Sequence, residues 1–430
     1  MCRFLKLALL VTAAVTMAVP NMAWTETPYQ NPDKVLADIV EAPQTPWVSL
    51  SPNEAIMLMM EPPSLPSVAE LAERELRLAG MRIKPQINGQ SRTRPLQSLS
   101  VLDIESREQR KILGIPEGAR IENTSWSPKG DKVLFTNTTS TGLELWVAEL
   151  DKAKARPLTG PVVSMTGNIS PVWLSDNETI VFARVPQGPR EEPKEKMVPD
   201  GPVTQENLGK VAPARTYQDL LKNPHDEELF EFYMAAQMCR VDMKGKVTAI
   251  GEEGLLWDFN PSPDGNYILV ETIHKPFSYL VPASRFPQRV EIFDLDGNLV
   301  REIVDLPLQE SVPIAFGSVT TGPRRFAWRN DAAAELVWAE ALDGGDAGKE
   351  SELRDKVVAL SAPFEGEPRE LMKLSQRFGG ITWGNDECAL VYSWWWKTRN
   401  LKTWRLYPGG SSESEVLSDR SWEDRYGDPG

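Results

Sequence analysis

Apolar and polar positions alternate in many short runs along this chain, and the clearest runs follow a tight turn. The turn SPKG at residues 127–130 leads into residues 132–135, and SPDG at residues 262–265 leads into residues 267–270. Proline at the second turn position presets φ, and glycine accepts the closing geometry, so the chain reverses into a strand. The pattern therefore predicts repeated units of turn and strand.

Weaker copies of this turn occur at residues 51–54, 174–177, 328–331 and 383–386. A tryptophan precedes or begins four of the six turns, at Trp126, Trp173, Trp328 and Trp383. Further strands with two-residue alternation follow at residues 143–150, 289–295 and 401–407. Short strands also occur in a β-sandwich. Six units that each restart with the same turn, at intervals of about 45 to 90 residues, favour an all-β fold, a β-propeller of four-stranded blades.

Two stretches interrupt the repeat, and we expect them to be insertions near residues 60–96 and 186–238. The first contains a helical period at residues 68–76. The second is rich in Pro, Glu, Lys and Gly, which predicts a long exposed loop. It ends in an acidic amphipathic pattern at residues 226–233, for which we expect a short helix.

The N-terminus has the pattern of a secretory signal peptide at residues 1–23. Arg3 and Lys6 precede an apolar run at residues 7–19, and Pro20 then breaks it before Ala23. The run is too short to span a bilayer comfortably. We therefore expect the propeller to occupy residues 24–430 of an exported, periplasmic or extracellular protein, with no membrane attachment after cleavage.

Cys239 and Cys388 are the cysteines that remain after such a cleavage. They could pair in an oxidising compartment, but two cysteines do not make a disulfide framework. Unpaired, partly buried thiols are the preferred interpretation. The net charge of −14 and the pI near 4.9 argue against nucleic acid as a partner, because phosphate binding needs clustered Lys and Arg.

Residues for catalysis are few. The chain has no Gly-x-Ser-x-Gly, no His-Glu-x-x-His, no Cys-x-x-Cys and no phosphate-binding glycine loop, so we expect no cofactor and no metal. It has two histidines. We interpret His274 as a histidine held by local hydrogen bonds, and His225 as a solvated loop residue. Glu227 and Glu228 could grip a free amino terminus, but a solvated helix face explains them better.

Several segments are more distinctive than the generic turns. They are residues 76–85, 272–286, 305–318, 341–347 and 419–430, with the strings TIHKPFSYLVP, PIAF and DGGDA among them. From about residue 28 onward the chain resembles the glutamyl endopeptidases, exported or plastid serine peptidases of the prolyl oligopeptidase family. Members continue with the rest of the propeller and then an α/β-hydrolase domain that carries the catalytic serine, aspartate and histidine.

The resemblance implies an incomplete propeller with short helical insertions, without the C-terminal α/β-hydrolase domain. No catalytic residue can then be carried over, and whether the chain is an enzyme stays uncertain. In the family the propeller covers the active site and filters peptides by size, so the implied partner is a peptide substrate reached through the hydrolase domain. The leading hypothesis is the substrate-gating propeller portion of an exported serine peptidase, not catalytic alone. The alternative is a stand-alone periplasmic propeller that serves as a protein-binding scaffold.

Cleavage after glutamate would require a cationic partner for the substrate carboxylate, because a guanidinium binds a carboxylate through two hydrogen bonds. Arg285 and Arg289 flank the distinctive segment at residues 272–286 and are the candidate substrate-binding residues. Ordinary surface charge is the competing explanation for both. The oligomeric state is left open by the sequence.

Overall fold

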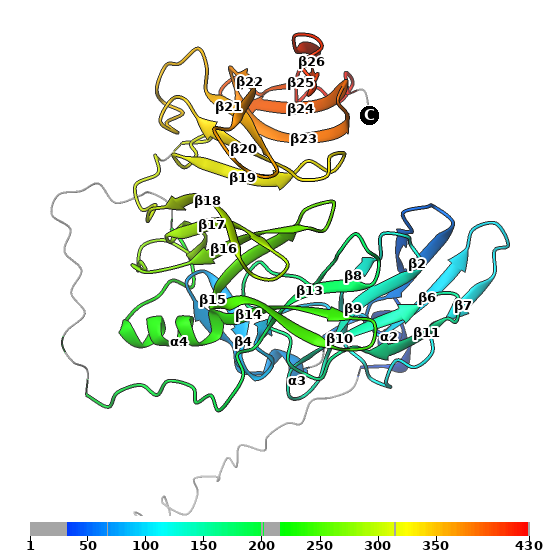
Figure 1. Ribbon diagram of the computed structural model, residues 1–430. Coiled ribbons are helices and arrows are strands. Elements are labelled where there is room, and N and C mark those ends of the chain that lie inside the picture. The colour runs from blue at the N-terminus through cyan, green and yellow to red at the C-terminus, as the bar shows by residue number, and fades with distance from the viewer. Residues whose placement is uncertain (1–31, 67, 199–200, 202–215, 314, 429–430) are drawn as a thin grey trace, which may run out of the picture. The chain divides into compact units, whose positions relative to one another are not determined.

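The computed structural model describes residues 32–66, 68–198, 201, 216–313 and 315–428. The predicted signal peptide at residues 1–23 lies outside them. The chain divides into two compact units, Met1–Pro43 and Gln44–Gly430. Helix α2 (Lys34–Val40) belongs to the first unit. The strands described below belong to the second unit (Figure 1).

Four of the sheets in the second unit have four antiparallel strands each, in chain order. The first sheet consists of β1 (Trp47–Leu50), β2 (Ile56–Glu61), β6 (Ser98–Asp103) and β7 (Gln109–Lys111). The second consists of β8 (Ile121–Trp126), β9 (Lys132–Thr138), β10 (Leu143–Glu149) and β11 (Lys154–Pro157). Towards the C-terminus lie β19 (Pro323–Trp328), β20 (Glu335–Ala341), β21 (Asp355–Ser361) and β22 (Arg369–Leu374). They precede β23 (Arg377–Asn385), β24 (Cys388–Trp395), β25 (Asn400–Leu406) and β26 (Glu415–Ser421).

A seven-stranded sheet lies between them in sequence. It consists of β12 (Val172–Trp173), β13 (Thr179–Arg184), β14 (Ala235–Asp242), β15 (Val247–Pro261), β16 (Tyr267–Ile273), β17 (Gln288–Asp294) and β18 (Leu299–Leu306). Strand β15 is 15 residues long, and it pairs with β14 through residues 247–255 and with β16 through residues 255–261. The sheet is therefore two four-stranded blades that share β15: β12 to β15 form the third blade, and β15 to β18 form the fourth. The prediction of an all-β propeller of four-stranded blades with short helical insertions is confirmed.

The SPKG and SPDG turns adopt the predicted turn geometry. Gly130 and Gly265 have φ of +71° and +73°, in the left-handed region that favours glycine. The amide of Gly265 donates to the Ser262 carbonyl at 2.8 Å, and the amide of Tyr267 donates to Ser262 Oγ at 3.0 Å. The serine at the first turn position therefore ties the turn to the strand that follows it.

Each blade packs against the next through a hydrophobic cluster. On β9, Phe135 belongs to the cluster between the first two blades, and its neighbour Leu134 belongs to the cluster between the second and third blades. Both side chains are fully buried. Successive strand residues point to opposite faces of a sheet, so a blade between two others must be apolar on both faces. This explains why runs such as residues 132–135 are almost continuously apolar.

The first insertion differs from its prediction. It contains α3 (Val68–Leu71), β3 (Leu76–Leu78), β4 (Met81–Lys84), the short 3-10 helix η1 (Pro85–Ile87) and β5 (Gly89–Gln90). The expected helix over residues 68–76 is wrong beyond its first turn. Ala79 and Gly80 have φ of +51° and +84° and close β3 and β4 into a hairpin. Tertiary packing of the buried Leu78 overrides the helical period here.

The second insertion contains the expected helix, α4 (Pro224–Met234). The side chain of Asn223 caps it by accepting a hydrogen bond from the amide of Asp226 at 2.9 Å. His225 therefore lies in the first turn of a helix, and its placement in a solvated loop was wrong. Its side chain is 21% exposed, and its Nδ1 lies 3.8 Å from Glu228.

Cys239 in β14 is buried, and Cys388 in β24 is half-buried; both thiols are free. The interpretation of unpaired cysteines is confirmed. Within the ranges that the structure describes, no helix combines the length and the apolar character needed to cross a bilayer.

Candidate functional site

Connections from three blades meet in one hydrophobic cluster. Each of them joins the second and third strands of its blade: β2 to β6, β13 to β14, and β16 to β17. The third connection contains the 3-10 helix η2 (Ala283–Arg285). We call this group the insertion cluster, and its buried members are Leu78, Ala79, Ile83, Leu221, Leu229, Phe230, Tyr233, Met234, Ile273, Val281, Ala283 and Phe286.

Helix α4 lies at the centre of the insertion cluster. Phe230 packs edge-on against Phe277 and Phe286, with ring centroids 5.0 and 5.5 Å away. The hydroxyl of Tyr279 donates to Glu227 Oε1 at 2.6 Å, and burial together with this bond raises the pKa of Tyr279 to about 12. Glu227 is therefore half-buried and tied to the fourth blade, so the prediction of a solvated face holds for it only in part. For Glu228, whose side chain is 51% exposed, the prediction is confirmed.

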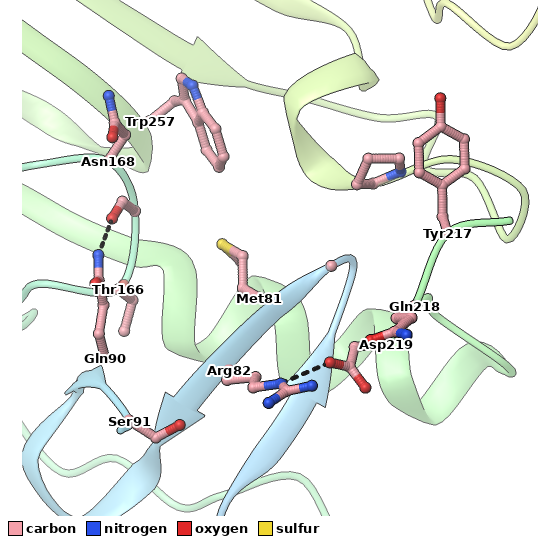
Figure 2. A pocket seen from close by; sticks show the side chains of 13 residues that line it. Met81, Arg82, Gln90, Ser91, Thr166, Asn168, Tyr217, Gln218, Asp219 and Trp257 are labelled. Carbon is pink, nitrogen blue, oxygen red and sulfur yellow. Dashed lines mark hydrogen bonds and ion pairs between the residues drawn. The ribbon is translucent and has the colours of Figure 1, made fainter. Parts of the chain in front are cut away.

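A hollow of about 640 Å³ opens beside the tip of the β3–β4 hairpin. We call it the hairpin pocket (Figure 2). It combines segments that are far apart in sequence, and it is lined by Gly80, Met81, Arg82, Gln90, Ser91, Thr166, Gly167, Asn168, Tyr217, Gln218, Asp219, Trp257 and Pro282.

The hairpin tip is fixed by backbone contacts on both sides. The amide of Gly80 donates to the Asp219 carbonyl, and the amide of Ala283 donates to the Ala79 carbonyl, both at 2.8 Å. A Cβ on Gly80 would lie 2.7 Å from Pro282 Cβ. Glycine is therefore required here by its positive φ and by the close approach of the fourth-blade connection.

One wall of the hairpin pocket carries an ion pair. Nε of Arg82 donates to Asp219 Oδ2 at 2.7 Å, and this bond raises the pKa of Arg82 (Figure 2). Asp219 also lies 3.8 Å from Nη1 of Arg77. Arg82 and Asp219 are 137 positions apart in the chain, so no local pattern in the sequence could have shown that they meet.

The opposite wall comes from the connection between the second and third blades. Gln90 Nε2 donates to the Gly167 carbonyl at 3.3 Å (Figure 2). The amide of Asn168 donates to the Trp257 carbonyl at 2.8 Å. Asn168 Nδ2 donates to Asp258 Oδ2 at 2.9 Å. The pocket is therefore joined by hydrogen bonds to β15, which is shared by two blades.

Behind Asn168 lie two carboxyl groups. Asp258 and Glu271 are direct cross-strand partners on β15 and β16. Burial, with a contribution from the charge of Asp258, raises the pKa of Glu271 from 4.5 to about 7. The folded chain therefore holds this proton more tightly than the unfolded chain does. Its stabilising effect is full below about pH 4.5 and is lost as the pH rises through about 7.

We expect the substitution Glu271→Gln to remove the loss of stability that the wild type shows as the pH rises through about 7. The variant should exceed the wild type in free energy of unfolding at pH 8, by about 3 kcal/mol at most, and the gap should close towards pH 5. Urea unfolding between pH 5 and pH 8 measures it. Glu228→Gln is the matched control, because that side chain is 51% exposed. Parallel pH profiles for Glu271→Gln and the wild type would contradict the prediction.

The two arginines predicted from the sequence lie in different surroundings. Arg285 ends η2, with its guanidinium 5.8 Å from the ring of Tyr217, which lines the hairpin pocket. Arg289 lies in β17, 3.6 Å from the carboxylate of Asp305 and 3.9 Å from that of Glu302. A role for either one in substrate binding stays a prediction.

His274 is held on both sides. Nδ1 lies 2.8 Å from the Lys275 carbonyl, and Nε2 lies 2.8 Å from Asp305 Oδ1. A general base needs a ring nitrogen that faces the proton it abstracts, so this arrangement does not suit one. The prediction of a histidine held by local hydrogen bonds is confirmed. In the described part of the chain, no group of three or more His, Cys, Asp and Glu residues is placed to hold a metal ion.

Comparison with known proteins gives the family. No family model matches the chain. A protein of Arabidopsis thaliana named "Probable glutamyl endopeptidase, chloroplastic" is 40% identical over an alignment of 435 positions, which covers 98% of this chain and 45% of that protein. A protein of the same name from Oryza sativa subsp. japonica is 38% identical over 94% of this chain and 44% of its own length.

Among solved structures, the Pyrococcus horikoshii acylaminoacyl peptidase matches 87% of this chain and 46% of its own, at 10% identity and a TM-score of 0.43. The chain thus spans less than half the length of the curated relatives that it matches. On the strength of the two sequence relatives, the chain belongs to the glutamyl endopeptidase-like group of the prolyl oligopeptidase family and matches its propeller portion.

Proposed function

We propose that this chain is the substrate-gating propeller portion of an exported serine peptidase and that it does not cleave peptide bonds itself. The observation that carries the proposal is the insertion cluster. Connections from three blades pack there into one surface beside a hollow of about 640 Å³. A peptide that enters such a hollow meets polar groups from the first-blade and third-blade connections and from residues 166–168 at once, and their spacing selects which peptides fit.

The bond-breaking chemistry is assigned, in this proposal, to the part of the relatives' length that this chain does not match. The sequence contains no nucleophile elbow, and His274 has both ring nitrogens engaged. An acyl-enzyme mechanism needs a nucleophile, a base and an orienting acid within hydrogen-bond reach. The pattern of residues 1–23 supports export, and N-terminal sequencing of the mature product would test it.

The first test is made on the purified chain. We expect no turnover of glutamate-containing peptides and no labelling by a fluorophosphonate that reacts with activated serines. Turnover that the fluorophosphonate abolishes would contradict the proposal. Binding of a whole protein by the chain, without any effect on proteolysis, would instead support the stand-alone scaffold.

The gating role is tested in a chimera in which this chain replaces the matching part of the Arabidopsis relative. We expect Gly80→Val to displace the hairpin tip from Pro282 and to let the chimera cleave longer peptides, with short-peptide kcat/KM unchanged. Gly118→Val is the matched control, because Gly118 also has positive φ (+71°) but has no atom within 4 Å of a Cβ position. Equal size limits in both variants would overturn the gating role.

A further inference from the structure

A second hollow of about 440 Å³ lies between η1 and the C-terminal end of α4. We call it the arginine pocket. It is bounded by connections of the first, second and third blades, and its lining includes Pro161, Val162, Arg184, Arg190, Glu192 and Phe232. Arg184 and Arg190 do not line the hairpin pocket, and they are not among the residues predicted from the sequence.

Arg184 is the last residue of β13 and is half-buried. Its Nε is buried and has no hydrogen-bond partner. A buried donor without a partner costs about 1 to 3 kcal/mol, so the guanidinium of Arg184, a residue that lines the hollow, lacks an acceptor for this donor. Within the described ranges, Arg184 forms no ion pair.

Arg190 reaches the same pocket from the loop that follows β13. Its guanidinium lies over the ring of Phe232, 4.1 Å from the centroid, and it donates to the Phe232 carbonyl. Burial lowers the pKa of Arg190. Among the residues that the structure describes, it too has no carboxylate partner in an ion pair.

The pocket's own carboxylate does not neutralise these charges. Glu192 is paired with Arg74, outside the pocket, and it accepts a hydrogen bond from the hydroxyl of Tyr233 at 2.7 Å. The bond to Arg74 lowers the pKa of Glu192. Two guanidiniums without an ion pair among the described residues thus line one hollow of a chain whose net charge is −14.

We propose that the arginine pocket binds a carboxylate of a peptide. A guanidinium presents parallel N–H donors that match the two oxygens of a carboxylate, and partial burial strengthens the attraction. Phe232, Pro161 and Val162 supply an apolar wall for the attached carbons. By contrast, Arg289 already has carboxylate partners. The inference rests on the proposed function, because it names the feature of the substrate that the gate would recognise.

The experiment measures binding to the purified chain by isothermal titration calorimetry, so it does not depend on peptidase activity. The probes are acetyl-Ala-Ala-Glu-Ala-Ala-amide, the same peptide with Gln in place of Glu, the Gln peptide with a free C-terminal carboxylate, and inorganic phosphate. We expect at least one carboxylate-bearing peptide to bind about tenfold or more tightly than the uncharged Gln amide. The Glu amide and the free acid distinguish a side-chain carboxylate from a C-terminal one.

The paired variants are Arg184→Gln and Arg190→Gln. Each is expected to weaken carboxylate binding about tenfold or more, and their combination is expected to abolish the preference over the Gln amide. Arg301→Gln is the matched control for net charge; its contact is the Gly366 carbonyl at 3.5 Å, away from the pocket. It should bind as the wild type does.

Three results would overturn the inference: equal affinity for charged and uncharged peptides, carboxylate binding that survives both arginine substitutions, or binding of phosphate without binding of either carboxylate peptide. Carboxylate binding without a size limit in the chimera would reject the gating role and support the carboxylate site. A size limit without carboxylate binding would support the gating role and reject the carboxylate site.

Discussion

The substitution Asp355→Ala is expected to lower the free energy of unfolding by about 3 to 5 kcal/mol. Asp355 is completely buried, as is Arg377, and Asp343 is 2% exposed. Arg377 donates to Asp355 Oδ1 at 2.9 Å and to Asp343 Oδ2 at 2.7 Å. Arg324 pairs with Asp355 as well. Removal of the Asp355 carboxylate would take away the ion-pair partner of Arg324 and leave Arg377 paired with Asp343 alone.

The cost arises because a buried ion that loses its partner keeps its full desolvation penalty. The amide of Phe378 also donates to Asp355 Oδ2 at 2.7 Å, so the start of β23 would lose an acceptor. Urea unfolding followed by tryptophan fluorescence measures the total, and hydrogen exchange of β21 and β23 amides locates it. Because those strands belong to different blades, we expect both to lose protection.

The control is Asp296→Ala. Asp296 pairs with Arg240 at 3.6 Å, but its side chain is 78% exposed. Exposed pairs of this kind contribute about 0 to 1 kcal/mol. A loss for Asp355→Ala no larger than that of Asp296→Ala would show that the buried network does not hold the two blades together.

The substitution Gly345→Ala is expected to cost about 3 kcal/mol, against about 1 kcal/mol for Gly344→Ala. The two glycines are adjacent in the DGGDA segment and have nearly equal φ, +74° and +70°. A Cβ on Gly345 would lie 2.2 Å from the Val319 carbonyl oxygen, whereas a Cβ on Gly344 would have no atom within 4 Å. Both substitutions thus strain the backbone equally, but only Gly345→Ala produces a steric clash.

The clash would also break a contact between chain segments. The amide of Val319 donates to the Gly345 carbonyl at 3.0 Å, and the Gly345 amide donates to Asp343 Oδ1 at 3.0 Å. Asp343 belongs to the buried network described above, so the damage should extend to it. The difference in unfolding free energy between the two variants is the measurement. Equal losses would mean that residue 319 moves aside without cost.

Local patterns were sufficient wherever a feature depends on neighbours in sequence. The SPKG and SPDG turns, the strand after each, and the helix ending at Met234 were predicted because turn residues and apolar periods act within a few positions. The prediction of a helix over residues 68–76 is wrong beyond its first turn. The helical period is present in the sequence, but the chain turns instead into a hairpin whose tip, at Ala79 and Gly80, has positive φ. The loop placement of His225 is wrong because Asn223 caps the helix two residues before it.

The sequence by itself determined the class of fold, the blade repeat and the family of this protein, because repeated turns and alternating strands follow from steric preferences of short segments. Only the tertiary structure decided which side chains share a pocket. Arg82 meets Asp219 across 137 residues, and Arg184 and Arg190 gather in one hollow with Phe232. Such contacts depend on how three connections pack against one another. Packing is set by burial of the whole insertion cluster, and no single stretch of sequence contains that information.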